Sequence, residues 1–252
     1  PPQPADPRSP LRRLFTSRSF VAFFVANTLG FGGEQMRLAA QSWWILDEGG
    51  STTVMGLAAG LRVIPFIIIS LYAGVMIDRY GGKRILIIER MILIVLALAT
   101  ASILLFAQVQ IWHIVVLSTL AGSTIALGNP ATQTVIPEVV PNELIQSANS
   151  VNQVSRALGQ TLAPLAAGIL AAARSAALAL FGLAAVYFGA LIATFGISAK
   201  HKRVSTPESA TRQIIEGLRY TSRTPILKWV ILLGTSVLFS GMIFPILPVY
   251  AK

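Results

Sequence analysis

The stretch GVMIDRYGGKR, residues 74–84, places two adjacent glycines, one acid and three bases between two long apolar runs. Gly74 would allow two helices to approach closely, and Gly81 with Gly82 permits a tight reversal of the chain. Asp78 is harder to explain, because an acid at the end of a helix meets the negative end of the helix dipole. We therefore expect Asp78 to have a local partner, either a base of the same turn or the N-terminus of another helix.

The composition indicates that lipid surrounds most of this chain. Of its 252 residues, 54% are hydrophobic and 12% are charged, whereas soluble domains carry roughly 25% charged residues. The mean hydropathy is +0.69. There is no cysteine, so disulfide bonds within these residues are excluded. The net charge of +10 would suggest a nucleic-acid partner for a soluble protein. The positions of the charges along the chain decide between nucleic-acid binding and an effect of membrane topology.

Seven apolar runs are long enough to predict membrane-spanning helices. A helix needs about 20 apolar residues to cross the hydrocarbon layer, and inside lipid its backbone groups must pair within the segment, which favours α-helices over strands. The fifth run is longer than the layer requires, and its polar first half is expected to project into the cytoplasm. The runs cover residues 20–46, 54–77, 85–107, 111–131, 143–173, 176–198 and 226–250.

Lysine and arginine are concentrated in alternate connections between these runs. Fourteen lie in the N-terminal tail, between the second and third runs, or between the sixth run and the start of the seventh, which includes Lys228, whereas the opposite connections hold only Arg174. Cytoplasmic loops carry the excess of basic residues, so the N-terminus is predicted to be cytoplasmic. The positive charge then reflects membrane topology, and no nucleic-acid partner is expected.

The runs and their connections predict four regions. They are a basic cytoplasmic tail at 1–18, a six-helix domain at 19–198, a basic cytoplasmic linker at 199–225 and a seventh helix at 226–252. In the tail, three apolar residues can rest on the bilayer surface: Leu11, Leu14 and Phe15. In the linker, the spacing of Ile214, Ile215 and Leu218 suggests a short helix on an anionic leaflet, with a solvated helix as the alternative. We expect the second domain to be cut short after helix 7.

The opening stretch also carries a family resemblance. Its spacing, Gly-x-x-x-Asp-Arg-x-Gly-x-Lys-Arg, resembles the conserved loop between helices 2 and 3 of the major facilitator superfamily. The matching positions are Gly74, Asp78, Arg79, Gly81, Lys83 and Arg84. The segments LRRLFTSRSFVAFFVANTLGFGGEQMRLAAQSWWIL (11–46) and GNPATQTVIPEVVPNELIQSANSVNQVSRALGQTLAPLAAGIL (128–170) are similar to the drug-efflux and enterobactin-exporter-like branch of that family.

This resemblance implies two six-helix domains with substrate bound between them and exchanged by alternating access. The chain would be an all-α polytopic membrane protein, an N-terminal bundle plus the truncated start of a second. It would belong to a proton-coupled exporter of small molecules in the bacterial inner membrane, and the 74–84 loop would hold its cytoplasmic side shut. A plain positive-inside turn is the alternative for the loop. One departure is that WHIVVLSTLAGSTIALGNPA (112–131) lacks the arginine that many proton-coupled drug antiporters carry inside helix 4.

Polar residues inside the first run indicate a functional site, since charges within a membrane are costly and usually functional. Asn27, Glu34 and Gln41 are seven apart and share one face, which Arg37 flanks. Arg62 in the second run lies at a similar depth, so Arg37 or Arg62 is expected to pair with Glu34. The acid is then either part of a structural ion pair or, as we favour, a proton-coupling or substrate-contacting group.

A second polar stripe runs along the fifth run at helical spacing, and should face a cavity or another helix. It consists of Asn149, Asn152, Gln153, Arg156 and Gln160. Arg156 is expected either to pair with an acid or to contact substrate. The deep charges identified in this way sum to +2, which favours an anionic or zwitterionic cargo. Glu89 and Arg90, near the inner end of the third run, are expected at the membrane interface instead.

Other classes of protein fit less well. The chain lacks the His-Glu-x-x-His sequence of a membrane metalloprotease and the Gly-x-x-x-x-Gly-Lys-Ser/Thr loop of a nucleotide-binding site. We expect no enzyme activity, no cofactor and no metal. The expected partners are a small-molecule substrate, protons, the lipid bilayer, and a missing C-terminal half or second chain. The alternatives are a non-transporting receptor or assembly protein on the same bundle, and a half-carrier that needs a partner chain.

Overall fold

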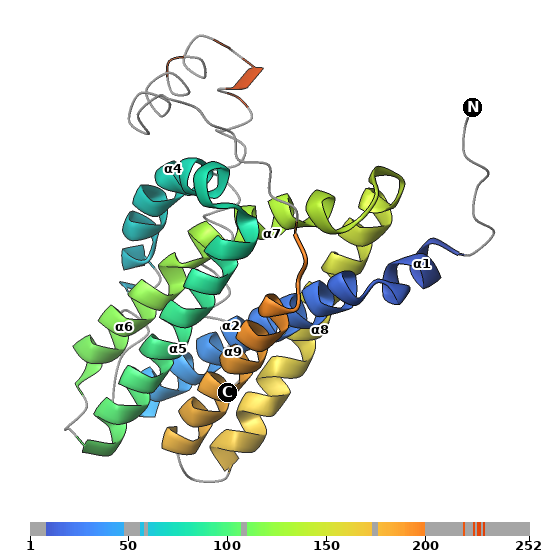
Figure 1. Ribbon diagram of the computed structural model, residues 1–252. Helices are drawn as coiled ribbons and strands as arrows, with labels where there is room; N and C mark the ends of the chain where they lie inside the picture. Colours follow the sequence, from blue (N-terminus) through green and yellow to red (C-terminus); the bar gives the residue numbers. More distant parts are fainter. Residues whose placement is uncertain are drawn as a thin grey trace, which may run out of the picture.

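The computed structural model describes residues 9–47, 56–57, 60–106, 110–172 and 176–199, and the single positions 219, 224, 226, 227 and 229. Every secondary-structure element in this part of the chain is a helix (Figure 1), as the sequence predicts. The seventh apolar run and the linker, with its predicted surface helix, lie almost entirely outside the described residues. The division into four regions therefore stays a prediction.

Helices lie at the first six predicted runs, but the run predicted at 54–77 corresponds to a helix at 63–80, and the fourth run is divided in two and extends past its predicted end. The helices are α1 (Pro10–Thr16), α2 (Arg18–Asp47), α4 (Val63–Tyr80), α5 (Gly82–Phe106), α6 (Ile111–Ser123), α7 (Ile125–Val139), the short 3-10 helix η1 (Asn142–Leu144), α8 (Ile145–Ala172) and α9 (Ala176–Phe195). By length and hydropathy, three stretches of the described chain can cross a membrane: Val63–Tyr80, Gly82–Ile103 and Trp112–Val139. The bent pair of α1 and α2 makes a fourth if it is counted as one span.

The N-terminal helix turns away from the bundle. α1 is set at 91° to α2, and Ser9 caps it by accepting a hydrogen bond from the Arg12 backbone N–H (3.4 Å). Leu11 and Phe15 are exposed, but Leu14 is 1% exposed and belongs to the apolar core. The prediction that all three residues rest on the bilayer is therefore wrong for Leu14, which helps to fix α1 to the bundle.

The long helices pack as neighbours in the order α4, α7, α5, α9, α2 and α8 (Figure 1). One apolar cluster lies near the 74–84 turn and includes Phe20, Ile77, Ile85 and Val135. A second cluster includes Met36, Leu93, Leu183 and Tyr187. The polar residues predicted for the site lie on helices that these two clusters hold together.

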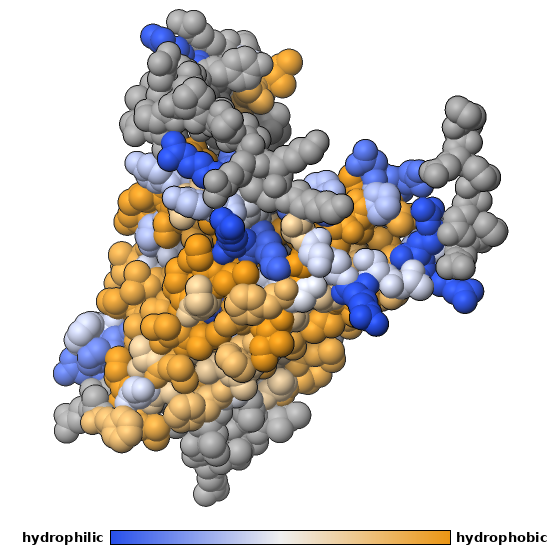
Figure 2. Space-filling view, viewed as in Figure 1, coloured by the Kyte–Doolittle hydropathy of each residue, from blue (hydrophilic) through white to orange (hydrophobic). Residues whose placement is uncertain are grey.

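The outer faces of the helices carry large apolar side chains. Ile64 on α4, Val95 on α5 and Ile192 on α9 are 60%, 64% and 58% exposed. Figure 2 shows such side chains spread over the flank of the bundle, with hydrophilic residues gathered toward its ends. Contiguous apolar surface of this kind is unusual on a soluble monomer, and it is the surface that helices present to lipid.

The turn between α4 and α5 depends on one glycine. Gly81 has a φ of 86° and donates its backbone N–H to the Ile77 carbonyl (2.7 Å), a conformation that other residues rarely adopt. Gly82 already belongs to α5, where a Cβ atom would lie 2.8 Å from the Ala131 carbonyl oxygen. It therefore permits close packing of α5 on α7 rather than the reversal itself.

Two other glycines show opposite environments. No described atom lies within 4 Å of the place a Cβ atom would take at Gly74, so the prediction of a close helix contact there is wrong within the described chain. At Gly159, by contrast, a Cβ atom would lie 2.7 Å from the Gly32 backbone nitrogen. The backbones of α2 and α8 thus meet at Gly159.

Replacing Gly159 with alanine should lower the free energy of unfolding by about 1–3 kcal/mol, because the added methyl group overpacks this contact. Gly74→Ala is the matched control, and alanine's higher helix propensity, about 1 kcal/mol, should make it neutral or slightly stabilising. Thermal unfolding in detergent, followed by circular dichroism, compares the two. Equal melting temperatures would contradict the packing described for α2 and α8.

Candidate functional site

A bidentate ion pair lies inside the bundle on α2. The Arg37 Nε atom donates to Glu34 Oε2 (2.9 Å) and its Nη2 atom donates to Glu34 Oε1 (2.6 Å). The two side chains are 9% and 14% exposed. Paired N–H donors on a carboxylate give one of the stronger and more directional polar contacts in proteins, so the orientation of Glu34 is fixed.

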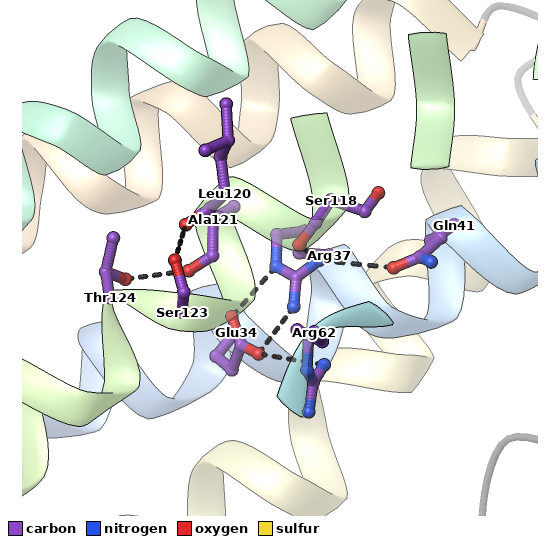
Figure 3. A network of polar contacts seen from close by, with 9 residues as sticks. All are labelled: Glu34, Arg37, Gln41, Arg62, Ser118, Leu120, Ala121, Ser123 and Thr124. Carbon is purple, nitrogen blue, oxygen red and sulfur yellow. Dashed lines mark hydrogen bonds and ion pairs between the residues drawn. The ribbon is translucent and has the colours of Figure 1, made fainter. Parts of the chain in front are cut away.

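The pair is extended by a third residue of α2 and by residues outside that helix (Figure 3). Arg37 Nη1 also donates to Gln41 Oε1 (3.2 Å) and to the Ser118 carbonyl oxygen of α6 (3.4 Å). Arg62, directly before α4, places its Nη1 atom 3.9 Å from Glu34 Oε1. The prediction that Arg37 or Arg62 pairs with Glu34 is confirmed for both residues, with Arg37 the closer and more buried partner.

A break in the fourth apolar run lies beside this network. Thr124 separates α6 from α7, and its hydroxyl donates to the Ala121 carbonyl oxygen (2.7 Å). The run continues to Val139, beyond the predicted end at residue 131. Next to the break, a Cβ atom at Gly122 would overlap the Arg62 side chain. The absence of a side chain at Gly122 therefore leaves the space through which the Arg62 side chain extends to Glu34.

Glu89 and Arg90 form a second buried pair, contrary to the prediction of an interfacial position. They are 4% and 5% exposed, and Arg90 Nη1 lies 2.9 Å from Glu89 Oε2. Each side chain faces a glycine of another helix. A Cβ atom at Gly128 would lie 2.6 Å from Glu89 Oε1, and one at Gly30 would overlap the Arg90 guanidinium.

The sequence did contain a signal for this pair. Leu86, Leu93 and Ala97 recur at helical spacing and are all buried, and Glu89 and Arg90 lie between them on the same side of α5. The prediction went wrong because it judged depth by distance from the preceding charged turn. That turn is compact, since Gly81 and Gly82 are themselves buried, and α5 is covered by other helices from its first turn.

The two pairs share one cavity of about 220 Å³. Its lining includes two carboxylates and three arginines, whereas Arg37 does not line it. The charged and polar lining residues are Glu34, Gln35, Arg62, Glu89, Arg90, Thr124, Asn129, Thr132, Arg156 and Gln160. Within the described residues, no group of three or more His, Asp or Glu is arranged to hold a metal ion. The cavity is suited to polar or charged groups of a ligand.

The predicted polar stripe of α8 divides between two environments. Asn152 is buried and accepts a hydrogen bond from Asn27 Nδ2 (3.0 Å), and Thr132 of α7 donates weakly to Asn27 Oδ1 (3.5 Å). Arg156 and Gln160 line the cavity. The remaining two members differ in exposure, with Asn149 half-buried and Gln153 exposed. One part of the stripe, at Asn152, therefore packs against α2, and another part, at Arg156 and Gln160, forms a polar surface of the cavity.

The 74–84 loop lies at the end of the bundle near the start of α2. Lys83 Nζ donates to the carbonyl oxygens of Phe195 (3.0 Å) and Ile197 (2.5 Å) at the end of α9. A cation at this position is also stabilised by the negative end of the helix dipole. Asp78 is exposed, and it has no hydrogen-bond or ion-pair partner among the described residues. The expected local partner of Asp78 is thus absent from the described chain. Two further bases of the loop, Arg79 and Arg84, are exposed.

Residues 15–252 match the Major Facilitator Superfamily, and the chain belongs to this family. It is 26% identical to the multidrug efflux pump Tap of Mycolicibacterium fortuitum, over 81% of this chain and 52% of that protein. It is 24% identical to the staphyloferrin A transporter of Staphylococcus aureus, over 75% and 48%. It is 22% identical to the enterobactin exporter EntS of Shigella boydii, over 95% and 56%. The chain spans about half the length of the curated relatives it matches.

Arg37 and Arg62 should differ in their contribution to stability although both pair with Glu34. Arg37→Gln should lower the free energy of unfolding by about 3 kcal/mol, because it breaks a buried bidentate pair. Arg62→Gln should cost less than about 1 kcal/mol, since Arg62 is 32% exposed and its contact is longer. Thermal unfolding in detergent tests this difference. An equal loss in both variants would show that the Arg62 contact matters as much as the bidentate pair.

Proposed function

We propose that this chain forms the N-terminal domain of a secondary transporter that exports small molecules by alternating access and is coupled to protons. The observation that carries the proposal is Glu34, a nearly buried carboxylate held by Arg37 and Arg62 at the wall of a polar cavity. The efflux and siderophore-export functions in the names of its relatives support the class of activity and its direction.

Glu34 is the proposed coupling acid. When it is ionised, its charge offsets part of the positive charge of Arg37 and Arg62. A proton on Glu34 would remove that compensation and leave Arg37 and Arg62 without a charged carboxylate partner. The preferred arrangement of the helices then depends on whether Glu34 carries a proton, because charges inside a membrane bundle need partners or water. Such a dependence is what coupling between proton binding and conformation requires.

The 74–84 loop is proposed as the gate on the cytoplasmic side. Lys83 is held by the end of α9, so we assign it a structural role. Asp78 is exposed and has no partner in the described chain, so it is available to a second domain when that side closes.

Asp78→Asn should therefore leave thermal stability unchanged and reduce transport severalfold, whereas Lys83→Met should mainly lower stability. Purified-protein melting curves and uptake assays separate these outcomes.

A second polypeptide layer is proposed to cover α8. Gln153 and Gln160 are exposed on the same stripe as Arg156, and exposed amides inside a membrane do not face lipid favourably. The layer would be a second six-helix domain of the same protein or a partner chain. We also propose that the N-terminus lies in the cytoplasm, from the distribution of basic residues, and that the membrane is the bacterial inner membrane, from the bacterial relatives.

A non-transporting receptor or assembly protein is the alternative, together with a half-carrier that requires a partner chain. A non-transporting receptor or assembly protein gives Glu34 no role in proton movement, whereas a paired half-carrier keeps that role. Cells that express the complete gene, compared with cells that lack it, distinguish a carrier from a receptor. The probes are ethidium, a permanent cation suited to a multidrug pump, and enterobactin, the compound in the name of one relative. We propose no enzymatic activity for this chain.

Replacing Glu34 with glutamine should abolish transport driven by a pH gradient and leave the folded protein in the membrane. Glutamine keeps the shape of the side chain but neither ionises nor releases a proton. The measurement is efflux of whichever probe is transported, in inverted membrane vesicles with and without an imposed pH gradient. Facilitated exchange of the probe without a gradient should persist in this variant.

The matched control is Glu143→Gln, at an exposed acid that pairs only at the surface with Arg13 (3.6 Å). This control should retain gradient-driven transport. If Glu34→Gln keeps full gradient-driven transport, Glu34 is not the coupling acid. Glu89→Gln, tested in parallel, would then show whether the second buried carboxylate of the same cavity carries the proton instead.

A further inference from the structure

Positive charge exceeds negative charge around the cavity. The carboxylates are Glu34 and Glu89, and the four arginines are Arg37, Arg62, Arg90 and Arg156. The prediction did not include the buried Glu89–Arg90 pair, but the net charge of this pair is zero. The excess of two positive charges expected from the sequence therefore remains. Glu34 is shared by two arginines, and its charge can balance only one of them. The question is where a compensating anion would bind.

Arg156 is the arginine that lacks a carboxylate partner. No Asp or Glu oxygen of the described residues lies within 4.0 Å of its guanidinium. Its one hydrogen bond to the described chain runs from Nη2 to Asn129 Oδ1 (3.3 Å), and its buried Nε atom has no partner. A guanidinium carries five N–H donors, so most of the N–H groups of Arg156 make no hydrogen bond to the described residues.

The surroundings of Arg156 hold it in position without neutralising it. The guanidinium carbon lies 4.4 Å from the centroid of the Phe31 ring, in a cation–π arrangement. Asn129 contacts the edge of the guanidinium and carries no charge. The ring covers one face of the planar group. The Nη1 atom makes no hydrogen bond to the described residues, so the Nη1–Nη2 end is the part that can make the in-plane contacts that arginine forms with carboxylates and phosphates.

We propose that Arg156, positioned by Asn129 and Phe31, is the binding site for an anionic group of the transported molecule, with Arg62 as a second cation on the same cavity wall. The group is a carboxylate, or an oxyanion of similar geometry. This inference rests on the proposed transport function and specifies its substrate class. The cavity volume of about 220 Å³ is below the roughly 300–1,000 Å³ of drug-sized pockets, so these helices receive the anionic end of a larger molecule.

The test uses cysteine reactivity, because these 252 residues contain no cysteine. Gln160→Cys places a thiol one helical turn from Arg156, on the lining of the same cavity. The complete protein, with any cysteine outside these residues changed to serine, is treated with methanethiosulfonates that carry either a sulfonate or a trimethylammonium group. Each rate is divided by the rate of the same reagent with a small free thiol, which removes intrinsic differences between the reagents.

We expect the sulfonate reagent to react faster by a factor on the order of threefold to tenfold, since a nearby unpaired cation attracts anions in a medium of intermediate dielectric constant. Arg156→Gln should remove this preference and Arg156→Lys should retain most of it. Arg12→Gln, at an exposed arginine of α1, is the matched control and should not change it. If Arg156→Gln does not fold, the anion site is still tested by comparing the reagent preference of the Arg156 protein with that of Arg156→Lys, and by the protection experiment that follows.

Benzoate and benzyltrimethylammonium are then compared as protecting agents in the protein that retains Arg156. Benzoate should slow modification of the cysteine at position 160, and the cation of similar size should not. Equal or faster reaction with the cationic reagent, or no protection by benzoate, would overturn the anion site. The readout needs neither a gradient nor transport, so it can succeed while Glu34→Gln shows normal coupling, and it can fail while transport itself is confirmed.

Discussion

The bidentate contact between Glu34 and Arg37 is the interaction on which the rest of the site depends. Two ionised side chains in the middle of an apolar bundle are unfavourable unless each finds a partner of opposite charge with good geometry. Their spacing of three residues on α2 supplies that geometry within one helix. Only secondary contacts then remain to be made: the Gln41 amide of the same helix, the Ser118 carbonyl of α6 and the longer approach of Arg62.

Glycines decide where the other charges fit. Gly30, Gly122 and Gly128 lie opposite Arg90, Arg62 and Glu89, and a methyl group at any of the three positions would occupy space that the charged side chain already fills. The long side chains can therefore cross between helices without forcing them apart. The same absence of side chains brings the backbones of α2 and α8 together at Gly159. Close packing and buried charge are thus achieved by one residue type.

Much of the fold could be predicted from the sequence, because apolar runs of spanning length and the charged turn at 74–84 each follow from local composition. The pairing of Glu34 with Arg37 was also predictable from spacing. The side of α5 on which Glu89 and Arg90 lie was indicated by the spacing of Leu86, Leu93 and Ala97, but the room for their charged groups depends on two glycines far away in the sequence. The environments of Gly74, Leu14 and Asp78 likewise depend on tertiary contacts, which residue type alone does not specify.

The uneven charge of the bundle has an electrical consequence. In the proposed transporter, the two uncompensated positive charges would lie within the transmembrane field, where moving one elementary charge through the whole field corresponds to about 2.3 kcal/mol per 100 mV. Any rocking of α4 or α8 that shifts Arg62 or Arg156 along the membrane normal would be favoured or opposed by the membrane potential. An anion bound at Arg156 would cancel part of that charge, so an empty and a loaded domain would respond to voltage differently.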